Sequence, residues 1–450
     1  MHVFSRSDAI FQIVSDTVKE WYFLQRERFF EWRNRHFQFR LLPKRINDFN
    51  VIPPYFALHL VRCLGPNASR EESMTFVRFL SHFLYTSLWL GHEAAGERAH
   101  KVCNLAKANR HMYLAAIADM DEDTRNNTGH SKGFMSLHRS LQKAEAAVEE
   151  AREFGEEAFL VTPEEAIQVE PRLERLPFGP IYGVSRPNDY VANCETFIRR
   201  WIKESADWGV HFETSNVEKL ERVESDNDKE KPTYHAFTAD GMKHEFDILI
   251  LASGVRTPLL ASRLGVANYC PTYPLRGFSL TLFTKEPTKP TKQNLLKQPI
   301  SIDSMYCTSV APSMARLVGF GEFCGFPDKA HDLPSIGPKV LTRYAQEIFP
   351  DAENLSVENV QPCFRPVSPD DLPIVGEVPS MPGLFIHTGH GTLGWTMGLA
   401  TGDCIAQAVI DRLNGQDTQK GTFTLAGGIS INRTDLSPKR FSKTFGSLKK

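Results

Sequence analysis

Hydrophobic residues recur along this chain at two spacings, one typical of helices and one typical of strands. Residues 70–160 are mostly helical in pattern, and helical spacing is clearest at Phe76 to Leu90, residues 140 to 154, and Thr196 to Trp208. Short apolar runs that fit strands are found at Gly209 to Thr214, Val217 to Val223, and Phe246 to Gly254, with more strands between residues 276 and 325. The pattern predicts a mixed α/β protein. The run from Phe246 is expected to be a buried strand ending in a small-residue turn, where α/β proteins bind cofactors.

A helix from about Thr392 to Leu413 contains three glycines four residues apart, at positions 394, 398 and 402. Each interior glycine costs about 1 kcal/mol relative to alanine, so the set would weaken a merely structural helix by about 3 kcal/mol. The face that they share is bare enough to approach something flat or closely packed. Gly389 and Gly391 precede the helix and allow a sharp turn that exposes its first amides. Those amides and the helix dipole favour negative charge or a polarised carbonyl.

Composition and charge describe an ordinary globular protein. A chain of 450 residues is too long for one simple core and predicts two domains, which are expected to interleave. The net charge of -2 gives no reason to expect nucleic acid or an anionic membrane as a partner. The eight cysteines are scattered without a Cys-x-x-Cys pair, which favours reduced thiols inside a cell. No run of 18 apolar residues occurs, so no transmembrane helix is expected, although peripheral membrane contact stays open.

The first 50 residues interleave aromatic and basic side chains. The aromatic ones include Trp21, Tyr22, Phe23, Phe29, Phe30 and Trp32, and the basic ones include Arg26, Arg28, Arg33 and Arg35. Such interleaving can stack nucleic-acid bases. An amphipathic helix explains it more simply, and the chain is not basic overall, so no nucleic-acid binding is expected.

Searches for cofactor and metal motifs find little. Gly319 to Gly325 has the spacing GxGxxxG, but Pro327 and Asp328 follow it where a nucleotide loop needs a helix. We interpret it as a glycine-thinned strand facing a ligand cavity. His387 and His390 are too isolated to predict a metal site, and no zinc spacing is present.

Arg365 lies between an aromatic residue and a proline, ahead of a turn that contains Asp370 and Asp371. A fixed arginine beside a cofactor helix is a natural bidentate anchor for a carboxylate. The alternative is a salt bridge to Asp370 or Asp371 that ties the turn. The residues alone weigh these two readings about equally.

Two segments together resemble a known family. Phe364-Arg-Pro-Val-Ser-Pro-Asp-Asp-Leu-Pro-Ile-Val-Gly376 and Thr388-Gly-His-Gly-Thr-Leu-Gly-Trp-Thr-Met397 closely resemble the C-terminal signature of the D-amino-acid dehydrogenase branch of the D-amino-acid oxidase-like flavoproteins. Weaker likeness in the same order is found at Arg186-Pro-Asn-Asp-Tyr, Leu251-Ala-Ser-Gly-Val, Tyr273-Pro-Leu-Arg-Gly-Phe-Ser-Leu, and Val318-Gly-Phe-Gly-Glu. The resemblance runs from about Phe29 to Leu413.

The resemblance implies a flavoenzyme with FAD as cofactor. The substrate carboxylate would pair with Arg365, and hydride would pass from its Cα to flavin N5, leaving an imino acid that hydrolyses to a 2-oxo acid. Amides of the turn would stabilise the negative charge on the reduced ring. The flavin contacts would be Gly389, His390, Gly391, Thr392, Leu393 and Gly394, with Val217 and Gly254 as weaker cofactor candidates. Tyr273, Tyr306 and Glu322 would line the substrate cavity, although each tyrosine is equally well explained as a core aromatic.

One part of the family pattern is missing from this sequence. The family begins with a strand, a GxGxxG turn, a helix and a second strand, whereas residues 1–28 contain no glycine. Without that first βαβ unit the FAD pyrophosphate loses its helix N-terminus, and the sheet lacks a central strand. We expect an incomplete gene model; the alternatives are a unit supplied by another chain and a degenerate, non-catalytic interaction protein.

The implied fold is an FAD-binding, glutathione-reductase-like Rossmann domain interleaved with a mixed-sheet substrate domain. The expected division is a non-matching segment 1–28, substrate-domain residues 29–185 and 271–361, FAD-binding residues 186–270 and 362–413, and a loose tail 414–450.

The expected reaction is oxidation of D-amino acids, with a secondary-amine oxidase or dehydrogenase acting on glycine, sarcosine or proline as the alternative. The electron acceptor would be a quinone or carrier, and the compartment the cytoplasm, with the mitochondrial matrix as alternative.

Overall fold

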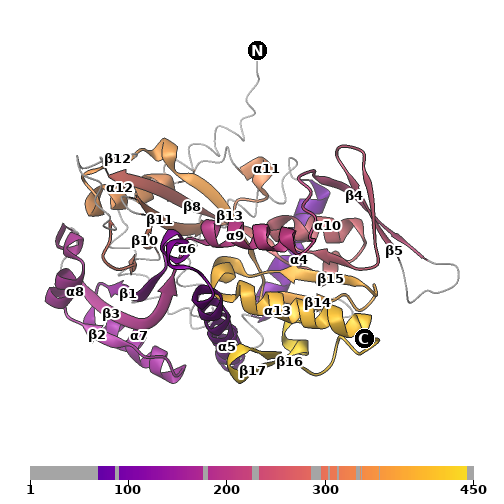
Figure 1. Cartoon of the computed structure of the whole chain (residues 1–450), viewed down its shortest axis with the longest axis horizontal. Coiled ribbons are helices and arrows are strands. Elements are labelled where there is room, and N and C mark those ends of the chain that lie inside the picture. The colour runs from indigo at the N-terminus through magenta and orange to yellow at the C-terminus, as the bar shows by residue number, and fades with distance from the viewer. Residues whose placement is uncertain are drawn as a thin grey trace, which may run out of the picture.

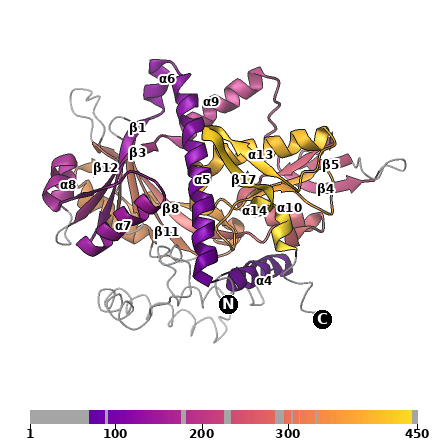
Figure 2. The same cartoon turned by 90° about the horizontal axis from the view of Figure 1, so that it is seen from below.

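The protein was analysed as a computed structural model that describes residues 69–86, 91–175, 181–224, 233–284, 295–302, 305–311, 314–330, 335, 337–353 and 355–442. The aromatic–basic segment of the first 50 residues lies outside them. Figure 1 shows a large sheet on one side and a smaller α/β unit on the other, and Figure 2 shows the long helix α5 (Gly91–Ala118) running between them. None of the described helices is both long enough and apolar enough to cross a membrane.

The large sheet has nine strands in the order β12-β8-β11-β10-β9-β1-β3-β2, with β13 also paired to β8. Their bounds are β1 Ser131–His138, β2 Phe159–Val161, β3 Tyr182–Val191, β8 Tyr273–Thr284, β9 Ile300–Ile302, β10 Met305–Ala311, β11 Met314–Glu322, β12 Ala352–Glu353 and β13 Gln361–Val367. All pairs are antiparallel except β1 with β9. Strands from two distant parts of the chain therefore build one sheet.

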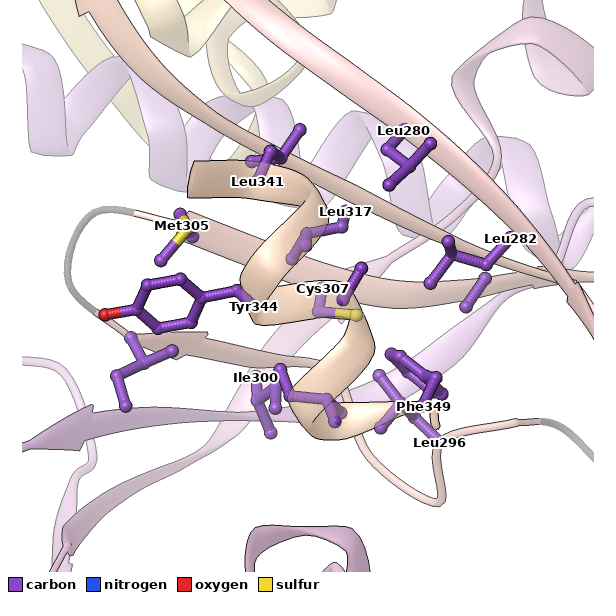
Figure 3. Close-up of a cluster of buried hydrophobic side chains, with 14 of the residues drawn as sticks. Leu280, Leu282, Leu296, Ile300, Met305, Cys307, Leu317, Leu341, Tyr344 and Phe349 are labelled. Atoms are coloured by element: carbon purple, nitrogen blue, oxygen red, sulfur yellow. The ribbon is translucent and has the colours of Figure 1, made fainter. Parts of the chain in front are cut away.

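One face of this sheet is buried under the helix α12 (Gly337–Ile348). Leu280 and Leu282 of β8 alternate with partly exposed residues, and they pack with Leu317 of β11 against Leu341 and Phe349 (Figure 3). This is the alternation expected of a strand with one buried face. On the opposite face of β8, Ser279 and Thr281 are partly exposed and Phe283 is exposed.

The smaller unit is built around the sheet β14-β15-β7. Its strands are β14 Ile374–Glu377, β15 Leu384–Thr388 and β7 Leu249–Leu251, with β15 and β7 parallel. The helix α13 (Gly394–Leu413) follows β15 and packs one face on α5 through Met397, Ala400 and Cys404. A second sheet, β4 (Val217–Val223), β5 (Thr233–Thr238) and β6 (Lys243–Phe246), lies nearby with α10 (Thr257–Arg263).

The remaining elements connect or cover these sheets. They are α4 Arg70–Leu84, α6 Glu122–Asn127, α7 Leu141–Glu153, α8 Pro163–Val169, α9 Cys194–Asp207, α11 Pro327–Ala330, α14 Arg433–Leu436, β16 Thr422–Leu425, β17 Ile429–Asn432, and the short 3-10 turns η2 Pro171–Arg175, η3 Gly254–Arg256, η4 Ala267–Tyr269, η5 Val357–Asn359, η6 Gly391–Leu393, η7 Ala426–Gly428 and η8 Pro438–Phe441. Helix α4 begins with a capping box in which Ser69 and Glu72 satisfy each other's backbone amides.

Several expectations are wrong in detail. Residues 209–214 form no strand, and Val210 and Phe212 are about half exposed, because they have no described strand to pair with. A strand, β1, interrupts the region expected to be helical. The expected domain boundaries at 185/186 and 361/362 fall inside β3 and β13, whose pairing continues through them into the large sheet.

The tail is not loose over residues 415–442. The hairpin of β16 and β17 buries Phe423, Leu425 and Ile431 against α13 and α5. Arg440 donates to the buried carboxylate of Asp370 at 2.8 and 3.1 Å. Its composition suggested a loose tail, but alternate apolar residues inside it provide a packing face.

Candidate active site

Three chain segments from separate parts of the sequence meet between the two sheets. They are the end of β13 and the turns η3 and η6, which follow the parallel strands β7 and β15. Val367 at the end of β13 forms a bridge with His390, and Thr388 Oγ1 donates to the Gly254 carbonyl oxygen at 3.2 Å. The carboxyl ends of parallel strands are where open α/β sheets bind ligands. The turns η3 and η6, which lie where such sheets bind ligands, therefore contact the end of β13 in the large sheet.

Arg365 lies on β13 two residues before Val367, which places its Cα about 7 Å along the strand from the bridge to His390. Its guanidinium lies flat over Gly277 of β8, where a Cβ would come within 2.5 Å of Nη1. Nη1 donates to the Phe320 carbonyl oxygen at 2.5 Å. Phe320 is a non-glycine residue at φ 66°, a costly backbone conformation that directs this carbonyl at the arginine. Gly277 and Phe320 were not singled out by the sequence, because their role depends on strand pairing.

Arg365 makes no ion pair within the described part of the chain. Asp370, its expected alternative partner, accepts instead from Arg440. A guanidinium has five N–H donors, and one hydrogen bond to Phe320 leaves the others for a ligand. The salt-bridge interpretation of Arg365 is thus wrong, and the carboxylate-anchor interpretation stays a prediction.

The turn before α13 is shaped by glycine. Gly389 and Gly391 have φ values of 82° and 53°, and Gly254 in the neighbouring turn has 57°. Neither η6 nor α13 has a side-chain cap at its N-terminus. Helix starts without caps leave amides to be satisfied by water or a ligand. Thr392 is exposed in this turn, and His390, Gly391, Leu393 and Gly394 are partly exposed.

His387 and His390 share one buried threonine. Their rings are perpendicular at 4.9 Å, and the two Nε2 atoms lie 3.0 and 2.8 Å from Thr401 Oγ1. The hydroxyl of Thr401 donates its proton to the Met397 carbonyl oxygen at 3.0 Å. Its oxygen can therefore only accept from the two imidazoles, so each histidine donates from Nε2. Burial lowers the pKa of His387 to about 4 and, with His387 nearby, that of His390 to about 3. Both rings are therefore neutral at ordinary pH and fix the turn to α13.

The face of the large sheet that carries Arg365 also carries Tyr306 on β10. Across the sheet, Tyr306 lies opposite Val318, Val318 opposite Ser279, and Ser279 opposite Gln361 of β13. Residues that lie opposite one another in a sheet point to the same face, and Gln361 shares its face with Arg365 four residues along β13. Tyr306 is 54% exposed. An open pocket of about 570 Å³ lies on the same face, lined by Ser279, Thr281, Phe283, Met314, Arg316, Asn359 and Gln361. This pocket could not be predicted from the sequence, because its residues come from three strands and a 3-10 turn.

The other predicted residues lie elsewhere. Tyr273 is 1% exposed within an aromatic cluster with Phe76 and Phe326, so it is a core residue and not available to a ligand. Glu322 is engaged with buried Arg276 at 3.1 Å, which is a structural use of its charge. Gly319 faces Met305 in the core rather than a cavity. Val217 begins β4 in the separate three-stranded sheet.

The described residues fit one end of an FAD molecule. The uncapped turn Gly389–Gly394, the positive-φ glycines and the adjacent sheet face suit a flat ring system with a polar edge. The residues that would hold it are Gly254, Gly389, His390, Gly391, Thr392, Leu393 and Gly394. The turn from Gly389 to Gly394 itself has the spacing Gly-x-Gly-x-x-Gly, and it lies between the strand β15 and the helix α13.

Comparison with known proteins agrees with this fold. The profile of the family described as DAO, FAD dependent oxidoreductase, matches residues 82–408. The D-amino acid dehydrogenase of Neisseria gonorrhoeae (strain NCCP11945) is 26% identical over 350 residues, which cover 76% of this chain and 74% of that protein. The D-amino acid dehydrogenase of Xylella fastidiosa (strain M12) is 28% identical over 292 residues, 63% of this chain and 62% of that protein.

Solved structures share the fold. Glycine oxidase from Geobacillus kaustophilus superposes with a TM-score of 0.54 at 22% identity, covering 70% of this chain and 79% of that one. L-Proline dehydrogenase from P. horikoshii gives a TM-score of 0.57 at 16% identity, covering 75% and 83%. The family profile spans most of the sequence, including every element that meets at the site. The chain belongs to the DAO family and is an FAD-dependent oxidoreductase.

Proposed function

We propose that this protein oxidises the C–N bond of D-amino acids to imino acids, which hydrolyse to 2-oxo acids. The observation that carries the proposal is Arg365, a guanidinium without an ion-pair partner in the described chain, held beside the turn His390–Gly394. The relatives at 26% and 28% identity are D-amino acid dehydrogenases, which supports the choice of substrate. We also propose that the electrons pass to a quinone or carrier rather than to oxygen, which the name dehydrogenase of these relatives supports.

Arg365 would bind the substrate carboxylate through two N–H groups while Phe320 and Gly277 fix the plane of its guanidinium. FAD, when bound, supplies the hydride acceptor. The amides at the start of α13 have no side-chain cap and lie at the positive end of the helix dipole. They would therefore stabilise a negative charge on a ligand group placed next to them. Neutral His387 and His390 would hold the turn without adding a charge that competes with this effect. Tyr306 would border the substrate on the open sheet face.

A secondary-amine substrate is the second candidate, because glycine oxidase and L-proline dehydrogenase share the fold. Those likenesses are below 25% identity and support the architecture alone. No disulfide joins the seven described cysteines to one another, which supports a reducing compartment such as the cytoplasm.

The test is reduction of an artificial acceptor dye by the FAD-loaded protein with D-alanine, D-phenylalanine, L-alanine, glycine, sarcosine or L-proline. The proposal expects turnover with the D-amino acids, at least tenfold faster in kcat/KM than with any of the others. Turnover confined to glycine, sarcosine or proline would instead support the second candidate, a secondary-amine oxidase or dehydrogenase. FAD-loaded protein that reduces no dye with any of the six would refute both candidates.

A further inference from the structure

Asn109 is a polar residue buried between the helices α5 and α13. It lies on α5 one turn after Leu105, where helical spacing calls for an apolar side chain, and it is 7% exposed. Leu105 and Ala108 beside it pack in the core that α5 shares with α13. A buried side-chain amide destabilises a core unless its donor and acceptor groups are bonded. The partners of Asn109 therefore indicate what this residue does.

The amide of Asn109 bonds to the backbone of α13 at three points. Its Nδ2 donates to the Trp395 carbonyl oxygen at 3.2 Å, and its Oδ1 accepts from the backbone N–H groups of Leu399 at 2.8 Å and Ala400 at 3.4 Å. In a regular α-helix the N–H of residue 399 bonds to the carbonyl of residue 395. Asn109 thus bonds both members of one backbone pair in the first turns of α13. A side chain that enters this ladder sets the local direction of the helix.

The ring of Trp395 is also fixed. Tyr113, one turn after Asn109 on α5, packs edge-on against it with the ring centroids 5.8 Å apart, and Phe197 of α9 does so at 5.3 Å. The hydroxyl of Tyr113 lies in turn 2.7 Å from His130 Nδ1. The start of α13 is therefore tied to α5 by a side-chain amide and by an aromatic contact.

Trp395 directly follows the turn Gly389–Gly394, where we place the flavin ring. On one side this turn is joined to the large sheet through the bridge between Val367 and His390. On its other side the chain continues into Trp395, so the bonds of Asn109 decide where α13 starts and how its first amides point. Neither η6 nor α13 has a side-chain cap that could fix them instead. Stabilisation of charge by amides depends on their direction and distance.

The direction of these amides matters more for the reduced cofactor than for the oxidised one. A hydride carries two electrons and one proton, so the ring gains one negative charge when it accepts a hydride from the substrate carbon. Amides at the positive end of a helix favour that charge, whereas they interact weakly with a neutral ring. An amide that points away from the ring would therefore weaken binding of the reduced cofactor more than binding of the oxidised cofactor.

We propose that Asn109 is a positioning residue that fixes the first turns of α13 on α5 and thereby raises the reduction potential of the bound flavin. It acts through the backbone of Trp395 and Leu399 rather than through contact with the substrate. The inference rests on the FAD-dependent activity of the family and on the placement of the flavin ring at Gly389–Gly394. It does not depend on whether the substrate is a D-amino acid or a secondary amine.

The test is Asn109→Leu, which removes all three bonds and nearly keeps the volume of the side chain. The backbone groups of Trp395 and Leu399 can then bond to each other, and replacing a buried polar group by an apolar one of similar volume is often neutral for stability. Unfolding in urea should therefore change little. The loaded protein should bind reduced flavin at least tenfold less tightly relative to oxidised flavin, which lowers the potential of this two-electron couple by about 30 mV.

Two further measurements separate positioning from general damage. Propionate binding reports the site of Arg365, which lies on β13, and its affinity should stay within about twofold. Amide hydrogen exchange of the chain without FAD should be at least tenfold faster at residues 391–395, because the start of α13 is no longer tied to α5. Asn104→Leu is the matched control, since Asn104 is exposed on the same helix, and it should change none of these values.

Asn109→Asp serves as the conservative variant. Its carboxyl group keeps an acceptor for Leu399 and Ala400, and in its protonated form it also donates to Trp395 as asparagine does. The potential of Asn109→Asp should therefore approach that of the unmodified protein as the pH is lowered, whereas Asn109→Leu should show no such recovery.

Three results would overturn the inference. They are an unchanged potential in Asn109→Leu, a loss of stability that unfolds this variant and so makes the role of Asn109 structural, and a chain that takes up no FAD, which would remove the ring from this turn. An unchanged potential beside turnover of D-amino acids would leave the proposed function standing. Turnover confined to secondary amines, with the potential lowered in Asn109→Leu, would leave this inference standing instead.

Discussion

Replacing Gly277 by alanine should damage substrate binding without touching the substrate. Gly277 lies under the guanidinium of Arg365, and an added Cβ would come within 2.5 Å of Nη1 and closer still to Nη2 and Cζ. Ordinary contact begins at 3.4 Å. The guanidinium must therefore move by about 1 Å, and misplacement of that size at a positioned group costs about a hundredfold in rate. Gly277 has no positive φ, so the backbone accepts alanine and the effect passes through Arg365 alone.

The expected result is a fall in kcat/KM of about a hundredfold, near 2.7 kcal/mol, expressed mainly as a higher KM. Loss of the hydrogen bond to Phe320 should cost about 1.5–3 kcal/mol of stability, partly offset by about 0.4–1 kcal/mol from replacing glycine. The assay is steady-state dye reduction by the FAD-loaded protein with a D-amino acid, beside urea unfolding. Binding of propionate, followed by calorimetry, reports the carboxylate site without turnover.

A double-mutant cycle decides whether Arg365 is the intermediary. If Gly277 acts through it, Gly277→Ala combined with Arg365→Met should be no worse than Arg365→Met alone. Arg343→Met is the matched control, since Arg343 is exposed on α12, which packs on the opposite face of the large sheet. Normal kinetics in Gly277→Ala, or fully additive losses in the cycle, would refute the reasoning.

Other predictions concern the histidine pair, the glycine helix and the buried ion pair. Because burial lowers the pKa of His387 and His390 from 6.5 to about 4 and about 3, the unfolded chain binds more protons in that window, so stability is full above pH 6.5 and declines toward pH 4. Replacing both histidines by asparagine should reduce the dependence of the melting temperature on pH between 6.5 and 4. A pH dependence equal to that of the unmodified protein would contradict this. Gly398→Ala should raise stability by up to about 1 kcal/mol, because its Cβ meets no described atom; a lower melting temperature would count against it. Glu322→Ala should cost about 3–5 kcal/mol in urea unfolding by removing the carboxylate that pairs with buried Arg276, whereas a stable variant with altered KM would restore Glu322 to the substrate site.

Local patterns predicted the elements whose signal lies within one segment. The helix expected from Thr392 to Leu413 is η6 followed by α13, and the strand expected at Val217 to Val223 is β4. The two signatures at Phe364 and Thr388 identified the family, because each packs many constrained residues into a short stretch. Glycine spacing correctly marked a turn with positive φ at positions 389 and 391.

What could not be predicted depends on partners distant in sequence. Gly277 looks like any strand glycine until β13 places Arg365 above it. Tyr273 and Tyr306 carry the same chemistry, yet one lies in a phenylalanine cluster and the other on an open face, because their strands present opposite environments. The apolar run at Leu249–Leu251 has the composition of a buried strand, but its exposure is set by the absence of a described neighbour. Register and pairing, rather than residue type, decide these cases.

The packing of the C-terminal segment has a consequence for biosynthesis. Phe441 lies against His82 of α4 at 5.2 Å, Asp435 pairs with Lys101 of α5 at 2.8 Å, and Arg440 holds Asp370 beside the site. The helices α4 and α5 thus complete their packing only after residues more than 300 positions later have been made. The nine-stranded sheet also contains strands more than 200 residues apart, such as β1 and β13. Contacts of such long sequence separation slow folding and keep intermediates exposed. Until Arg440 has left the ribosome, the turn that contains Asp370 lacks this anchor, so this part of the fold can be completed only after the C-terminal segment has been made.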